Sequence, residues 1–98
     1  MNRAIKIKLI AESFQPDAIG QNIPTETYTE VFAITKDVSR DEFNNPVDGL
    51  RPSKVFRVLV TEYHDEEIIE YNNTRYTIYR TYLRNDARIE LYAGERIG

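Results

Sequence analysis

The side chains that most often carry out catalysis are scarce in this chain of 98 residues. His64 is its one imidazole, and it lies in an acidic run, residues 64–67. A histidine that acts as a general base must have a reacting group within hydrogen-bond reach, and the chain has no G-x-S-x-G nucleophile elbow. It also has neither glycine-rich phosphate-binding pattern, G-x-x-x-x-G-K-[ST] or G-x-G-x-x-G. These observations favour a solvated turn histidine, and they predict that the chain is not an enzyme.

A divalent cation is the other chemistry that residues 64–67 could support, since they combine His64 with three carboxylates. Consecutive residues on one turn do not converge as the alternating ligands of a calcium loop do. The chain contains no cysteine, which excludes a cysteine nucleophile and thiolate-held zinc or iron–sulfur sites. We therefore expect a wet, charged hairpin tip here, and we expect neither a metal nor a cofactor.

Tyrosine and arginine form the pattern most suggestive of binding. Five of the seven tyrosines lie within residues 63–82, with arginines interleaved. If residues 74–83 form a strand, alternation predicts one face with Ile78, Arg80 and Tyr82 and another with Tyr79, Thr81 and Leu83. Three interpretations stay open: packing of the tyrosines under arginine stems, a protein interface, and a single-stranded nucleic-acid platform. The candidate subunit-contact residues are Tyr79, Arg80, Tyr82 and Arg84.

The overall charge argues against a general nucleic-acid binder. The chain carries 13 basic and 16 acidic side chains, a net charge of −3, and its pI is about 5.1, whereas such binders show a basic excess. The length predicts one domain, spanning residues 1–98. No apolar run approaches the roughly 18 residues of a membrane span, and the first residues lack the apolar block of a signal peptide.

Alternating hydrophobicity predicts an all-β fold. We expect strands at residues 4–12, 28–36, 55–63, 68–71, 74–83 and 88–92. Proline, glycine and amide residues predict a long loop over residues 13–27. Asn72 and Asn73 predict a two-residue hairpin turn, because asparagine tolerates positive φ. Together these elements predict a small β-barrel of about six mostly antiparallel strands, with one short helix in a long loop.

That loop is expected over residues 37–54. Ser39 and Glu42 have the spacing of a capping box, in which the serine hydroxyl accepts from the Glu42 N–H and the carboxylate reaches back to the Ser39 N–H. The short helix should end near Asn44, Asn45 and Pro46, because proline disfavours helix in the preceding residue. Asp48 and Gly49 mark a further turn.

The order of several short motifs resembles one protein family. Residues 76–82 (YTIYRTY), 89–92 (IELY) and 95–98 (ERIG) are similar to the bacteriophage head closure proteins, the head–tail adaptors or stoppers of long-tailed phages. Residues 38–43 (VSRDEF), 49–52 (GLRP) and 55–56 (VF) resemble the loop-and-strand region of that family. The resemblance covers roughly residues 28–98.

This resemblance implies a structural role in the virion, at the head–tail junction, for a protein made in the bacterial cytoplasm. It implies a ring of copies on the portal that closes the channel after DNA packaging and offers a tail attachment surface. The implied partners are the portal-associated adaptor, the tail completion protein, further copies of this chain and the packaged DNA, without a membrane. The channel-loop candidates are Ser39, Asp41, Glu42, Phe43, Asn44, Asn45 and Asp48. A single-stranded nucleic-acid-binding barrel and a tail completion protein are the alternatives.

Overall fold

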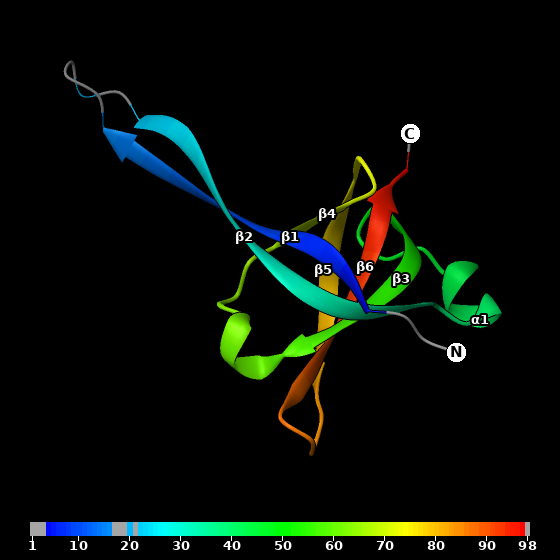
Figure 1. The fold of residues 1–98 in the computed structure, drawn as a ribbon. Coiled ribbons are helices and arrows are strands. Elements are labelled where there is room, and N and C mark those ends of the chain that lie inside the picture. Colours follow the sequence, from blue (N-terminus) through cyan, green and yellow to red (C-terminus); the bar gives the residue numbers. More distant parts are fainter. Residues whose placement is uncertain (1–3, 17–19, 21, 98) are drawn as a thin grey trace.

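The structure, a computed structural model, describes residues 4–16, 20 and 22–97. Six antiparallel strands close into a barrel in the order β1-β2-β3-β6-β5-β4 (Figure 1). The strands are β1 (Ala4–Pro16), β2 (Asn22–Asp37), β3 (Leu50–Leu59), β4 (Ile68–Tyr71), β5 (Thr74–Leu83) and β6 (Arg88–Arg96). One helix, α1 (Arg40–Phe43), lies between β2 and β3, and a 3-10 turn, η1 (Val60–Glu62), follows β3. The predicted barrel with one short helix is confirmed.

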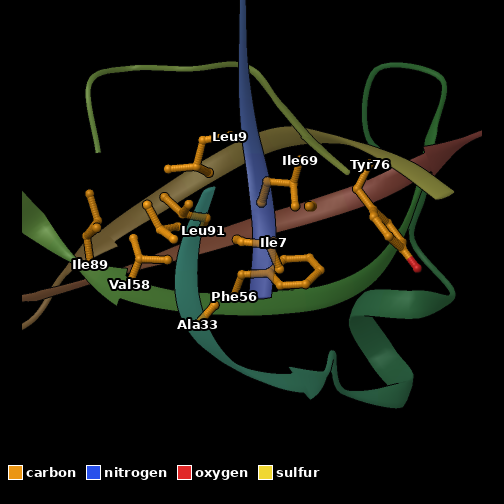
Figure 2. Packing of buried hydrophobic residues seen from close by; sticks show 11 residues of the cluster. Ile7, Leu9, Ala33, Phe56, Val58, Ile69, Tyr76, Ile89 and Leu91 are labelled. Carbon is orange, nitrogen blue, oxygen red and sulfur yellow. The ribbon is translucent and has the colours of Figure 1, made fainter. Parts of the chain in front are cut away.

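Alternation along the strands builds the core. In β1, Ile7 and Leu9 are buried inside the barrel while Lys6 and Lys8 lie on its outside, as a half-buried strand requires. Phe56 of β3 is fully buried and packs against two tyrosine rings, with ring centroids 6.1 Å from Tyr71 and 5.6 Å from Tyr76. Figure 2 shows the buried side chains of Ile7, Leu9, Phe56, Ile69 and Leu91 gathered between the strands. The other members of the cluster are Val31, Ala33, Val58, Ile69, Ile89, Leu91 and Ala93.

The predicted turn between β4 and β5 is confirmed. Asn72 and Asn73 both have positive φ, 55° and 63°, and the flanking Tyr71 and Thr74 are paired. This is the backbone that a two-residue hairpin turn needs to match the twist of its strands. At the far end of β5, the Arg84 N–H donates to the Arg88 carbonyl, 2.8 Å away, and Ala87 takes the positive φ of that turn.

The predicted loop over residues 13–27 is wrong for residues 13–16 and 22–27, which form strands, while residues 17–19 and 21 lie outside the described residues. β1 continues to Pro16 and β2 begins at Asn22, and the two strands pair from Ala4↔Ile34 to Pro16↔Asn22. Beyond Ile10, the last β1 residue paired with β4, the two strands project from the barrel as an arm (Figure 1). The threonines at 25, 27 and 29 favour strand. Prolines are tolerated in this arm because no other strand of the described residues pairs with its edges.

The expected loop over residues 37–54 is shorter in the structure and covers residues 38–49. β3 starts at Leu50 and passes Pro52 through a register shift between Pro52 and Lys54, which is one of the places where a strand accepts proline. Opposite this shift is Gly94, whose missing Cβ would lie 2.6 Å from the Arg51 carbonyl oxygen. The close approach of the two backbones therefore requires glycine. The expected strand at 55–63 instead ends at Leu59, and the last strand extends to Arg96.

Candidate functional site: the helical loop and the strand that holds it

The loop between β2 and β3 opens with a capped helix. Ser39 has extended backbone angles, and its Oγ accepts from the Glu42 N–H at 3.2 Å. This satisfies one of the backbone donors that a helix start leaves free. The helix ends at Asn44, whose N–H donates to the Arg40 carbonyl, and the Asn45 side chain donates to the Asp41 carbonyl. The serine half of the predicted capping box is confirmed.

The loop closes with a tight turn over residues 47–50. Asp48 and Gly49 have φ values of 50° and 77°, and Val47 and Leu50 exchange two backbone hydrogen bonds of 2.9 and 2.8 Å. An Asp-Gly pair with both φ values positive is typical of a two-residue hairpin turn. The Gly49 carbonyl also accepts from the Ile97 N–H, 3.0 Å away, just after β6. The turn predicted from Asp48 and Gly49 is thus a hairpin tied to the end of β6.

Two side chains of β3 hold the loop near its two bases. At one base, Lys54 Nζ lies 2.8 Å from Asp37 Oδ1, and this hydrogen bond raises the pKa of Lys54. Near the other, Arg51 donates to the Phe43 carbonyl at 2.9 Å, and its guanidinium lies 5.1 Å from the centre of the Phe43 ring. These contacts hold the helix beside β3.

The Glu42 carboxylate joins the loop to β5. It accepts a hydrogen bond from the Tyr79 hydroxyl. Its two oxygens also accept from Arg80 Nη2, at 3.1 and 3.2 Å. It does not take the return role of a capping box, because the contacts described for its oxygens all go to β5. Burial, then the hydrogen bond to Glu42, raises the pKa of Tyr79. The loop is therefore fastened to the barrel by a contact between residues 37 positions apart.

A chain of polar contacts continues from Arg80 along the outside of the barrel. The Arg80 guanidinium lies 4.0 Å from the centre of the Tyr92 ring, and the Tyr92 hydroxyl donates to Glu90 at 3.2 Å. Glu90 is buried, and its other oxygen accepts from Arg84 at 3.0 Å. Burial, followed by the nearby Glu90 carboxylate, raises the pKa of Tyr92. A buried carboxylate is costly unless it is paired, so Arg84 and Tyr92 stabilise Glu90.

A β-bulge corrects the face pattern predicted for β5. The register shifts between Ile78 and Arg80, leaving Tyr79 as the extra residue. Ile78 pairs with Ala93 and packs against the core, whereas Arg80 lies outside over the Tyr92 ring. The prediction that Ile78 shares a face with Arg80 and Tyr82 is therefore wrong. A bulge re-aims side chains, and here it lets two consecutive residues, Tyr79 and Arg80, both reach Glu42.

The structure brings only part of the two candidate sets together. Glu42 of the loop set contacts Tyr79 and Arg80 of the β5 set. Tyr82 is 60% exposed near the end of β5, and Arg84 contacts Asp86 and Glu90 instead of the loop. In the loop set, Ser39, Asn44 and Asn45 stabilise the helix, and the Phe43 carbonyl accepts a hydrogen bond from Arg51. Asp48 forms the turn, and the Asp41 side chain is exposed.

Two exposed aromatic residues of β2 are not among the predicted site residues. Tyr28 and Phe32 of β2 lie on the outside of the barrel, 62% and 66% exposed. Lys8 Nζ lies 4.8 Å from the Tyr28 ring centre, and Lys6 Nζ lies 5.8 Å from that of Phe32. The strand pattern of residues 28–36 was recognised, but the exposure of its aromatic residues depends on which face meets the core. The alternation Tyr28, Glu30, Phe32 could have indicated this face.

The acidic run at residues 64–67 is not a hairpin tip, because β3 and β4, which it connects, are not neighbours. Glu66 is buried, and its carboxylate accepts from the His64 N–H at 2.7 Å. The Tyr63 hydroxyl donates to the Glu66 carbonyl at 3.0 Å. Burial, then the nearby carboxylates, raises the pKa of Tyr63. Within residues 4–16, 20 and 22–97, no group of three or more histidine, cysteine or acidic residues is arranged to hold a metal ion.

Comparison with protein-family models, curated proteins and solved structures finds no match to this chain. Among the residues that the structure describes, no helix is long and apolar enough to cross a membrane. The candidate site is a short capped loop, anchored at both bases and fastened at its middle to β5.

Proposed function

We propose that this chain is a non-enzymatic head–tail connector component of a long-tailed phage, which closes the portal channel after DNA packaging and provides the tail attachment surface. The observation that carries the proposal is the loop of residues 38–49, a compact excursion from a closed barrel that is fastened in one position through Glu42. Loops on a rigid scaffold are common places for function. The motif resemblance over residues 28–98 supports the same assignment.

The charge of the loop fits a surface that faces DNA without adhering to it. Residues 38–49 contain three acids, Asp41, Glu42 and Asp48, and one base, Arg40. Glu42 is paired with Arg80, whereas Asp41 and Asp48 are exposed. Carboxylates near phosphates repel them. In a ring, such loops would block the channel by their bulk and would release DNA readily once the channel opens.

A single-stranded nucleic-acid-binding barrel is less well supported. That function would need free tyrosine rings and arginines on β5 for stacking and phosphate contacts. Tyr79 and Arg80 instead contact Glu42, and Arg80 covers the Tyr92 ring. A salt titration of binding to single-stranded DNA tests this alternative, because a phosphate binder loses affinity steeply as salt rises.

A tail completion protein is separated from a head closure protein by an order-of-addition assay. Purified protein is added either to DNA-filled heads that lack it or to free tails, and binding is followed by sedimentation and electron microscopy. We expect it to bind the heads, to stop DNA leakage and to make the heads competent for tails. Binding to tails alone would assign it to the other side of the junction, and binding to neither would contradict the proposal.

Reversal of the exposed loop charge tests whether the loop faces DNA. Asp41→Lys combined with Asp48→Lys reverses the exposed loop charge, and Glu67→Lys, an exposed acid outside the loop, is the matched control. We expect particles with the loop variant to retain DNA and eject it more slowly than the control particles do. Equal ejection kinetics for the two would show that these carboxylates do not face the DNA.

A further inference from the structure

Within the residues that the structure describes, a stretch of β2 and a stretch of β5 each have one edge that no other strand covers. β2 pairs with β1 from Asn22 to Ile34 but with β3 only from Ile34 to Asp37. β5 pairs with β4 from Thr74 to Thr77 and with β6 as far as Leu83. Among the described residues, the β3-side edge of β2 before Ile34 and the β4-side edge of β5 after Ile78 have no strand partner. Such edges are templates for pairing with another chain.

The hydrogen bonds of the neighbouring ladders indicate which backbone groups point out of each edge. Val38 donates to Ser53 across the β2–β3 ladder, and backbone direction alternates along a strand. The even-numbered residues of β2, Tyr28, Glu30 and Phe32, therefore direct their N–H and C=O groups to the free edge. Arg84 donates to Arg88 toward β6, so the odd-numbered residues at the end of β5, residues 81 and 83, face the other free edge.

Both edges also carry exposed large hydrophobic side chains. Tyr28 and Phe32 on β2 are 62% and 66% exposed, and Tyr82 and Leu83 on β5 are 60% and 64% exposed. Neither residues 28–33 nor residues 79–83 include a lysine or a proline, the residues that most often block an edge. The charged residues differ in sign: the first stretch contains Glu30, and the second contains Arg80, whose side chain is paired with Glu42 but remains 54% exposed.

We infer that the free edge of β2 in one copy of this chain pairs with the free edge of β5 in a second copy. Opposite charges favour this arrangement over pairing of two β2 edges, which would bring Glu30 of both copies close together. The strands run parallel. In that orientation Phe32 or Tyr28, whose backbone groups face the edge, lies beside Tyr82, whose backbone groups face away, as a parallel ladder requires. The outer faces of both copies then continue on one side.

The inferred contact joins two different surfaces, so it continues from copy to copy and closes a ring if the rotation allows. The inference deepens the proposed function, because a ring on the portal requires contacts of this kind. It does not depend on which structure the ring binds. Antiparallel pairing would instead set the outward side chains of β2 against Thr81 and Leu83, which lie on the opposite face of β5 from Arg80 and Tyr82, and the two outer faces would not be continuous.

Disulfide trapping tests the contact directly, because the chain has no cysteine of its own. Adjacent strands are about 4.8 Å apart, a separation that a disulfide spans. Phe32→Cys or Tyr28→Cys protein is mixed with Tyr82→Cys protein that carries a mass tag, and the mixture is oxidised. We expect mixed dimers of 28 or 32 with 82. Ile97→Cys, which also replaces an exposed apolar residue, is the matched control and is expected to react far more slowly.

A backbone substitution gives a second readout. Thr81→Pro removes an N–H that faces the free edge, and proline is tolerated where that group makes no ladder bond. Thr81→Ala keeps the N–H and serves as the control. We expect both variants to retain the far-ultraviolet circular dichroism of the barrel, and only Thr81→Pro to lose the mixed dimers. If it is unfolded, the trapping of the single-cysteine proteins still decides the question.

The remaining outcomes separate the edge pairing from head closure. Mixed dimers that form no faster than those with Cys at position 97 would overturn it, and so would a dominant dimer between two β2 edges. A protein that forms the mixed dimers but binds no heads would contradict head closure alone. A protein that binds heads without forming mixed dimers would contradict the edge pairing alone.

Discussion

Replacement of Glu42 by glutamine is expected to loosen the loop from β5. The Glu42 carboxylate accepts from the Tyr79 hydroxyl and from the Arg80 guanidinium. Glutamine has nearly the same shape and helix preference, but it carries no charge. Glu42→Gln therefore removes the electrostatic part of both contacts and leaves the packing and the Ser39 cap in place.

The size of the effect follows from the exposure of the two contacts. A hydrogen bond to a charged group contributes about 1.5–3 kcal/mol, and loss of the charge removes roughly half of that. The Arg80 side chain is 54% exposed, so its ion pair contributes only about 0.2–1 kcal/mol. With both contacts weakened, Glu42→Gln should lower the free energy of unfolding by about 1–2 kcal/mol.

Urea denaturation followed by circular dichroism measures this change. With a slope of about 2 kcal/mol per molar urea, the midpoint should fall by about 0.5–1 M. Asp41→Asn is the matched control, because it makes the same charge change on the same helix and the contact described for Asp41 uses only its backbone carbonyl. We expect the free energy of unfolding of Asp41→Asn to stay within about 0.5 kcal/mol of the wild-type value.

A double-mutant cycle with Tyr79→Phe isolates the coupling between the loop and β5. Residues in direct contact show non-additive effects, so the double variant should lose less than the sum of the single losses. A Glu42→Gln midpoint equal to that of Asp41→Asn would refute the reasoning. Strict additivity of the two substitutions would likewise show that the carboxylate and the hydroxyl are not coupled.

Three further perturbations address the core, the loop and the tyrosines whose pKa is raised. Phe56→Ala should lower the free energy of unfolding by about 3–5 kcal/mol, because it loses buried apolar surface and leaves a cavity. In the same chemical denaturation, the surface substitution Phe32→Ala should change that free energy by less than about 0.5 kcal/mol, and equal midpoints for the two variants would place Phe56 outside the core. Deletion of residues 41–48 should leave a folded barrel, because shortening a loop changes its closure entropy little. Particles built with this variant should lose DNA or attach tails poorly, and fully infectious particles would contradict a gating role for the loop. The pKa values of Tyr63, Tyr76, Tyr79 and Tyr92 are raised in the folded state, so the stability that these neutral tyrosines contribute is complete below about pH 10 and is lost as pH rises beyond it. The free energy of unfolding should therefore decline above about pH 10, and the absorbance of these four tyrosinates should appear at higher pH than that of an ordinary tyrosine. A free energy of unfolding that stays constant above about pH 10 would contradict the raised pKa values.

Features that depend on near neighbours could be predicted from the sequence. The period-two pattern of Ile5, Ile7 and Leu9 identifies a half-buried strand, because alternate side chains point to opposite faces whatever the strand pairs with. The Ser39 cap and the Asn72-Asn73 turn join residues no more than three positions apart. The barrel class follows from six such strands with turns between them.

Features that depend on distant partners were decided only by the tertiary structure. Loop prediction over residues 13–27 failed because proline and glycine are local turn signals, whereas the arm exists through pairing of β1 with β2 along its whole length. Glu42 has the spacing of a capping box, but its carboxylate goes to β5, 37 residues away. That contact requires the bulge at Tyr79, which changes the side-chain alternation by one residue. A one-residue shift moves every following side chain to the other face, and no pattern within β5 alone shows where it occurs.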